Sequence, residues 1–190
     1  MASRYECEVR FFIKDIEKFR DRIKELGGIV KFPYEFTDYY YLHRNEKWNP
    51  ILKNIRIREW SYPRKPTCIY LTKNEIKETK GIKFKKSLYK EGKLPLFSAN
   101  IKECKEVLHD LGFLPWITVI KKECKLYEVP KKFITIEEYI PELGWTGELE
   151  IEGDNITSAS EYIRKSLDLL KIKEYTYKSI SSLVAEAKGQ

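Results

Sequence analysis

Two short acidic runs near opposite ends of the chain place glutamates at every second residue. They are Glu6-Cys7-Glu8-Val9-Arg10 and Glu148-Leu149-Glu150-Ile151-Glu152. Side chains at i and i+2 of a β-strand share one face, so each run predicts a strand with stacked carboxylates. Like charges at this spacing repel one another unless a cation lies between them. The two runs therefore predict the two halves of a site for a hard metal ion.

Basic residues occur at the same spacing between the acidic runs. Ile55-Arg56-Ile57-Arg58 alternates arginines with apolar residues, and lysines recur in other strand-like segments. Carboxylates and guanidinium groups on such faces together favour a polyanion bound with a metal ion. An alternating charged strand is also typical of the solvent-exposed face of a sheet. Each run taken alone leaves that plainer interpretation open.

Length and composition favour one globular domain over residues 1–190. The chain is 42% hydrophobic and 14% aromatic, which is ample for a core. Its four cysteines show no CxxC spacing, which predicts free thiols in a reducing compartment and no zinc site. No apolar run approaches the roughly 20 residues of a membrane span, and the charged N-terminus lacks a signal-peptide core. We expect a cytoplasmic protein without a membrane partner.

Apolar periodicity and turn residues predict about eight strands and four helices. Long antiparallel strands expose hydrogen-bonding edges unless the sheet closes on itself. We therefore expect an α+β fold of mainly antiparallel strands, an eight-stranded closed β-barrel with a few flanking helices. The expected strands are 5–13, 36–42, 54–60, 67–73, 83–89, 116–127, 132–139 and 148–152, and the expected helices are 15–26, 100–111, one capped by Ser158 or Ser160, and 179–188.

If the charged face of each strand points inward, the interior of the barrel is too polar to be a packed core. It would instead be a wet tunnel that holds a ligand. Carboxylates without His or Cys partners favour Mg²⁺ or Mn²⁺. The residues expected to line this tunnel are Glu6, Glu8, Arg10, Arg56, Arg58, Lys73, Glu148 and Glu150.

These segments, taken in order, resemble the CYTH domain, whose members are also called triphosphate tunnel metalloenzymes. The run from Glu6 to Arg10 is similar to the ExExK signature that opens this domain, with Arg in the place of Lys. Glu138, a loop that ends in Leu143-Gly144, and the closing Glu-x-Glu run resemble the other end of the domain. Residues 176–183 are similar to the C-terminal segment of the class IV adenylyl cyclase branch.

The chain departs from the family pattern at three places. Lys122-Glu123-Cys124 stands where Lys-x-Arg is usual, so the basic residue there could instead be Lys121 or Lys125. Glu138 replaces an Asp, and the neighbouring Glu137 leaves the register open by one residue. The segment 83–91 is basic but lacks the acidic partner of the family's Arg-x-Glu strand.

The resemblance implies a metal-dependent triphosphatase that hydrolyses inorganic triphosphate or a nucleoside triphosphate. Attack of a metal-activated water on the terminal phosphorus would cleave the substrate. A class IV adenylyl cyclase, which forms cyclic AMP and pyrophosphate from ATP, is the alternative, and the family also suggests a homodimer. By this resemblance, one or two Mg²⁺ or Mn²⁺ ions are held by the catalytic Glu6, Glu8, Glu148 and Glu150 with Glu138, and the triphosphate is bound by Arg10, Arg56, Arg58, Lys73 and Lys122.

A basic nucleic-acid-binding barrel is the third hypothesis. A net charge of +7 and 13 tyrosines would suit it. Paired glutamates in a nucleic-acid groove, however, would repel the phosphate backbone. We therefore expect no nucleic-acid partner.

Overall fold

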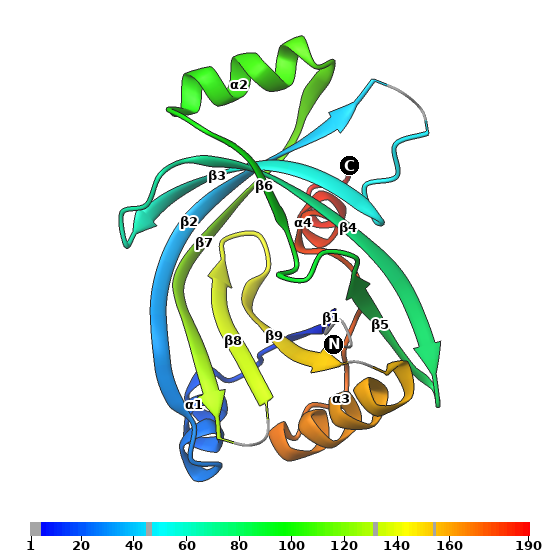
Figure 1. The fold of residues 1–190 in the computed structure, drawn as a ribbon. Helices are drawn as coiled ribbons and strands as arrows, with labels where there is room; N and C mark the ends of the chain where they lie inside the picture. The colour runs from blue at the N-terminus through cyan, green and yellow to red at the C-terminus, as the bar shows by residue number, and fades with distance from the viewer. Residues whose placement is uncertain (1–4, 45–46, 131–132, 154) are drawn as a thin grey trace.

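A computed structural model describes residues 5–44, 47–130, 133–153 and 155–190 of the chain. Its main feature is one antiparallel sheet in the order β3-β2-β7-β8-β9-β1-β5-β4-β6, which closes through an additional β3–β4 pairing. Eight strands form the closed barrel and β6 pairs with β4 as an extra strand (Figure 1). The predicted closed barrel is thus confirmed. The strands are β1 (Tyr5–Phe12), β2 (Ile29–His43), β3 (Lys53–Tyr62), β4 (Cys68–Thr79), β5 (Ile82–Ser87), β6 (Leu94–Ser98), β7 (Phe113–Val129), β8 (Phe133–Ile140) and β9 (Gly144–Gly153).

Several strands are longer than their sequence pattern indicated. β2 and β7 share an antiparallel ladder that is interrupted by register shifts, for example between Tyr34 and Phe36. Such irregularities break the two-residue alternation, so only part of each strand carries a clean signal. β6 was not predicted, and its five residues are all exposed. Lys132, the first residue of one expected strand, lies outside the described residues.

Four helices lie at the positions where helices were expected. Asp15 caps α1, as predicted, by accepting a hydrogen bond from the Lys18 backbone N–H at 3.1 Å. The cap of α3 is Asn155, whose Oδ1 accepts from the Thr157 N–H at 2.8 Å, so the expected Ser158 or Ser160 cap was wrong. The helices are α1 (Ile16–Glu25), α2 (Ile101–Asp110), α3 (Ile156–Leu170) and α4 (Ile180–Ala187).

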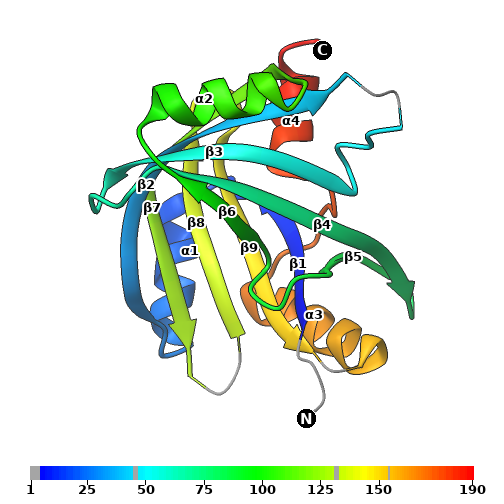
Figure 2. The same ribbon diagram turned by 45° about the horizontal axis from the view of Figure 1, so that its top comes forward.

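The hydrophobic core lies between the barrel and its helices. On one side, Val9 and Phe11 of β1 and Leu149 of β9 pack with residues of α1 and α3, such as Phe19 and Ile163. A second cluster joins β3 and β4 to α2, which lies at the other end of the molecule from α1 and α3 (Figure 2). Where a strand packs against these helices, its outward face is therefore its apolar face. The inward faces carry the charged residues together with some aromatic ones.

Helix α4 packs over one end of the barrel. Its apolar residues Ile180, Leu183 and Val184 contact Val119 of β7 and Tyr40 of β2 in a separate core cluster. All four cysteines are buried, and no disulfide joins any two of them in the described part of the chain. Among the described residues, no helix has the length and apolar character needed to span a membrane.

Candidate active site

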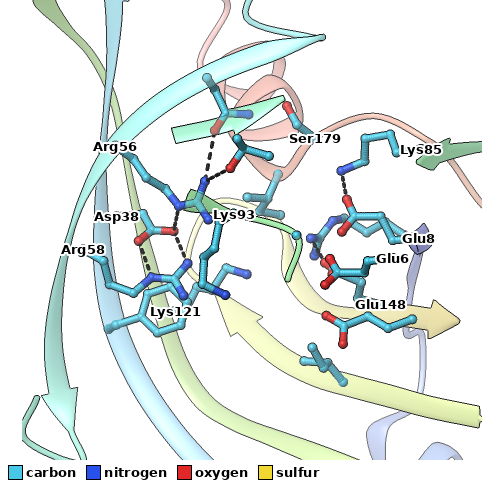
Figure 3. A pocket seen from close by; sticks show the side chains of 18 of the residues that line it. Glu6, Glu8, Asp38, Arg56, Arg58, Lys85, Lys93, Lys121, Glu148 and Ser179 are labelled. Carbon is cyan, nitrogen blue, oxygen red and sulfur yellow. Dashed lines mark hydrogen bonds and ion pairs between the residues drawn. The ribbon is translucent and has the colours of Figure 1, made fainter. Parts of the chain in front are cut away.

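The barrel encloses a cavity of about 300 Å³. Seven of the eight residues expected to line the tunnel do line it, since inward-facing positions alternate with outward-facing ones along each strand. Figure 3 shows Arg56 and Arg58 on one side of this cavity and Glu6, Glu8 and Glu148 on the other. The seven residues are Glu6, Glu8, Arg10, Arg56, Arg58, Glu148 and Glu150.

A buried aspartate holds the two arginines in place. Asp38 is fully buried and accepts two hydrogen bonds from Arg58, from Nε and Nη2, both at 2.7 Å. Arg56 Nε lies 3.2 Å from the same carboxylate. Burial alone would raise the pKa of Asp38, but the two guanidinium groups outweigh it and the pKa is lowered. Asp38 therefore stays ionised and fixes the direction of both side chains.

Arg56 is also held from the far side by neutral groups. Its Nη1 donates to Asn54 Oδ1 at 3.0 Å and to Thr72 Oγ1 at 2.7 Å. Neither partner carries a charge, and a single aspartate faces two arginines. The pair therefore keeps a net positive charge toward the cavity, which suits an anion.

Three lysines also line the cavity, and of these only Lys121 was anticipated, as an alternative to Lys122. They are Lys85 of β5, Lys121 of β7 and Lys93 of the β5–β6 loop. Burial lowers the pKa of Lys85 to about 8 and lowers the pKa of Lys121. The pKa of Lys93 is lowered by burial and by the charges of Arg58 and Arg56. A bound anion would relieve this crowding of positive charge.

On the glutamate side of the cavity, it is acidic groups that are crowded together. Burial, followed by the charge of Glu150, raises the pKa of Glu6 to about 7. The pKa of Glu150 is raised as well, mainly by burial. Among the described residues, no ion pair joins a cation to either carboxylate at 4.0 Å or less, whereas Glu8 pairs with Lys85. Carboxylates that resist ionisation because they are buried together are a donor set that fits a divalent cation.

Two further carboxylates are joined by one arginine. The Arg10 guanidinium donates from Nη1 to Glu138 and from Nη2 to Glu148. Glu138 also pairs with Lys121 and does not line the cavity. Burial would raise the pKa of Glu138, but Lys121 and Arg10 outweigh it and the pKa is lowered. Within the described part of the chain, no three His, Cys, Asp or Glu side chains are already grouped as metal ligands.

The expected positions of Lys73 and Lys122 in the tunnel were wrong. Both lysines are exposed and neither lines the cavity. On β4, it is Thr72 and Asn74 that face inward, so Lys73 between them points outward. On β7, a bulge follows Lys122, and Glu123 has a φ of 50°. Lys121 is the inward residue there, one of the alternatives that the sequence left open.

The same register settles the choice between two neighbouring glutamates on β8. Glu138 faces Arg10 and Lys121, whereas Glu137 lies on the outer side and binds Arg20 of α1, with Nε–Oε1 at 3.0 Å. Glu138 is therefore the inward acidic residue, as expected. Its direct neighbours are the positively charged side chains of Arg10 and Lys121.

The β5–β6 loop passes directly over the glutamate side of the cavity. Gly92 has a φ of +71°, and a Cβ built on it would lie 2.4 Å from Glu6 Oε1. Only a residue without a side chain allows this approach. The loop therefore brings the Lys93 side chain between the arginines and the carboxylates (Figure 3).

Comparison with known proteins identifies the class of this tunnel. A family model of the CYTH domain matches residues 4–182, and the chain belongs to that family. No curated protein matches the chain.

Solved structures from three kinds of organism share the fold. A conserved hypothetical protein from Pyrococcus furiosus is 22% identical, with a TM-score of 0.71 over 94% of this chain and 99% of that chain. An adenylate cyclase candidate from Vibrio parahaemolyticus is 14% identical, with a TM-score of 0.68 over 96% and 99%. An adenylyl cyclase candidate from Hippeastrum, described as having a dominant triphosphatase activity, is 12% identical, with a TM-score of 0.59 over 97% and 96%. At these identities the likeness shows the fold.

Proposed function

We propose that the protein is a metal-dependent triphosphatase that hydrolyses a triphosphate inside its barrel. The observation that carries this proposal is the division of one cavity into a cationic side and a carboxylate side. A polyanion alone would be repelled by the glutamates, and a metal ion alone would be repelled by the arginines and lysines. A triphosphate bound together with a divalent cation satisfies both sides.

The carboxylate side would hold the metal. Glu6 and Glu150 would be its first ligands because burial has already made their ionisation costly, and Glu8 and Glu148 lie beside them. When bound, Mg²⁺ or Mn²⁺ would neutralise phosphate oxygens and activate a water molecule for attack on the terminal phosphorus. In this assignment Glu138 neutralises Arg10 and Lys121 from behind.

The cationic side would bind the phosphate chain. Arg56 and Arg58 are fixed by Asp38, so they lose little freedom when they bind phosphate oxygens. Lys93 and Lys121 replace Lys73 and Lys122 in this role, whereas Lys85 pairs with Glu8 on the carboxylate side. Loss of one such contact should raise the barrier by about 2–4 kcal/mol, by analogy with the removal of one oxyanion donor.

An adenylyl cyclase would use the same two sides of the cavity, and the Vibrio and Hippeastrum neighbours make it the second candidate. The reactions differ in their products. Hydrolysis of the terminal phosphate releases orthophosphate, whereas attack by the ribose 3′-hydroxyl on the α-phosphorus releases pyrophosphate and cyclic AMP.

One experiment tests both candidates. Purified protein is incubated with ATP or inorganic triphosphate, with Mg²⁺, with Mn²⁺ or with EDTA, and the products are separated. We expect orthophosphate from a triphosphate only when metal is present. Cyclic AMP with pyrophosphate would replace the triphosphatase with the cyclase. Absence of turnover with every metal and substrate would reject both.

A further inference from the structure

Part of the cavity wall is aromatic and carries no charge. Three successive inward positions of β2 before Asp38 and one of β3 are aromatic, and β7 and β8 each add an aliphatic side chain. An uncharged aromatic surface offers little favourable interaction to a metal ion or to a phosphate chain. We call it the aromatic wall, and it consists of Phe32, Tyr34, Phe36, Trp60, Leu126 and Ile136.

The aromatic wall continues directly from the cationic side. Along β2 the inward residues change from aromatic to acidic between Phe36 and Asp38, and along β3 they change from basic to aromatic between Arg58 and Trp60. Phe36 pairs with Trp60, and Asp38 pairs with Arg58. The Arg58 guanidinium lies 3.5 Å from the centroid of the Phe36 ring. A phosphate bound at Arg58 would therefore have the aromatic wall as its neighbour.

Two rings of the aromatic wall are accessible to a ligand. Tyr34 and Phe36 are buried, whereas Phe32 and Trp60 are only partly buried. The ammonium of Lys65 lies 4.5 Å from the Phe32 centroid and 4.3 Å from the Trp60 centroid, but Lys65 itself is an exposed loop residue. A flexible, solvated lysine can move aside at little cost.

The aromatic wall also contains polar atoms that could form hydrogen bonds with a ligand. Within the described part of the chain, neither the Tyr34 hydroxyl nor the Trp60 indole N–H has a hydrogen-bond partner. Neither polar atom is fully buried, so each is accessible from the cavity. A ligand ring that carries nitrogen or oxygen atoms could supply a hydrogen-bond partner.

From this arrangement we infer that the aromatic wall binds the organic part of the substrate, a planar heteroaromatic ring such as a nucleobase. The inference rests on the proposed function and names the substrate class, an organic triphosphate in preference to inorganic triphosphate. The phosphate chain lies against Arg58 and the ring stacks on Trp60 and Phe32. Stacking of a base on an aromatic side chain contributes about 1–3 kcal/mol. Inorganic triphosphate, which has only oxygens to offer, gains nothing there.

The test compares Trp60→Leu with Trp145→Leu in the full chain. Leucine keeps the apolar character of position 60 but removes the stacking face. Trp145 is a matched control because it packs against Tyr139 and Arg20 and does not line the cavity. KM and kcat are measured with ATP and with inorganic triphosphate in the presence of Mg²⁺. Circular dichroism confirms that each variant is folded.

In Trp60→Leu, we expect the ratio of the KM for ATP to the KM for inorganic triphosphate to rise roughly 5- to 100-fold, the range that base stacking implies. In Trp145→Leu the ratio should stay within about 2-fold of the wild-type ratio. Equal shifts for both substrates in Trp60→Leu would overturn the inference. So would a wild-type kcat/KM that is higher for inorganic triphosphate than for every nucleoside triphosphate tried.

Calorimetric titration separates this inference from the proposed function. If no triphosphate is hydrolysed, the proposed function fails, but binding of a non-hydrolysable ATP analogue can still be measured against inorganic triphosphate. Tighter binding of the analogue that is lost in Trp60→Leu would support the aromatic wall as a binding surface. Equal affinity for both ligands, or no change in Trp60→Leu, would overturn it.

Discussion

At the scale of single residues, Glu6 links the binding of metal to the binding of protons. Its pKa is raised from an ordinary value near 4.5 to about 7 by burial and by Glu150. A raised pKa means that the folded protein holds the proton more tightly than the unfolded chain does. Without metal, the free energy of unfolding should therefore fall as pH rises through this window.

We predict that Glu6→Gln removes this loss of stability and also abolishes turnover. Gln cannot ionise, so the variant should melt at a higher temperature than the wild type above pH 7 in EDTA, yet it should bind metal poorly. Thermal denaturation between pH 4.5 and 8 and a triphosphatase assay would measure the two effects. Glu25→Gln, on the exposed surface of α1, is the control and should change neither. Full activity in Glu6→Gln would exclude Glu6 as a metal ligand.

Asp38 should be a stabilising residue as well as a positioning one. The variant Asp38→Asn would leave two buried guanidinium groups without their carboxylate. Breaking a buried pair in this way costs about 3–5 kcal/mol, so the urea midpoint should fall markedly. Glu59→Gln is the control, since Glu59 accepts a hydrogen bond from the Tyr39 hydroxyl and does not line the cavity. Its cost should stay under about 1 kcal/mol. Similar midpoints for both variants would contradict the role of Asp38.

At the scale of the elements, the β5–β6 loop depends on a glycine next to Glu6. We predict that Gly92→Ala lowers kcat/KM at least about 10-fold because its Cβ would displace the Glu6 carboxylate. Gly27→Ala is a matched control, since Gly27 has a φ of +78° but nothing within 4 Å of the added Cβ. Both variants should lose about 1–2 kcal/mol of stability through left-handed strain. Only Gly92→Ala should lose activity, and equal kinetics in the two variants would remove the loop from the site.

The regularity of each strand determines how well the sequence predicts its inward residues. Where alternation is regular, as from Glu6 to Arg10 and from Arg56 to Arg58, the inward residues were predicted correctly. Where a bulge shifts the register, as after Lys122, the inward residue was wrong by one.

Other residues of the site gave no periodic signal. Asp38 lies on an aromatic strand and has no acidic partner at i−2 or i+2. Lys93 is in a loop and reaches the cavity only because the closed barrel places the loop above Glu6. The aromatic wall requires the pairing of Phe36 with Trp60, which are far apart in the chain. Such contacts are set by tertiary structure and not by local spacing.

At the scale of the whole molecule, the barrel packs one set of apolar residues outside, under the helices, and holds charged residues beside the aromatic wall inside. Buried charges of one sign destabilise a fold, and such charges face one another on both sides of the cavity, among lysines and arginines and between Glu6 and Glu150. A ligand that neutralises both sides should therefore stabilise the fold more than either component does.

We predict that Mg²⁺ together with a non-hydrolysable triphosphate raises the melting temperature by more than the sum of the two separate shifts. Each component alone corrects one side of the cavity, whereas the pair corrects both, so each should raise the affinity for the other. At 100 times the dissociation constant, a ligand stabilises the native state by about 2.7 kcal/mol. Thermal shift measurements with metal, with triphosphate, with both and with EDTA would show the coupling. Strictly additive shifts would mean that the two sides of the cavity bind independently, and a full shift with triphosphate in EDTA would show that the carboxylates need no cation.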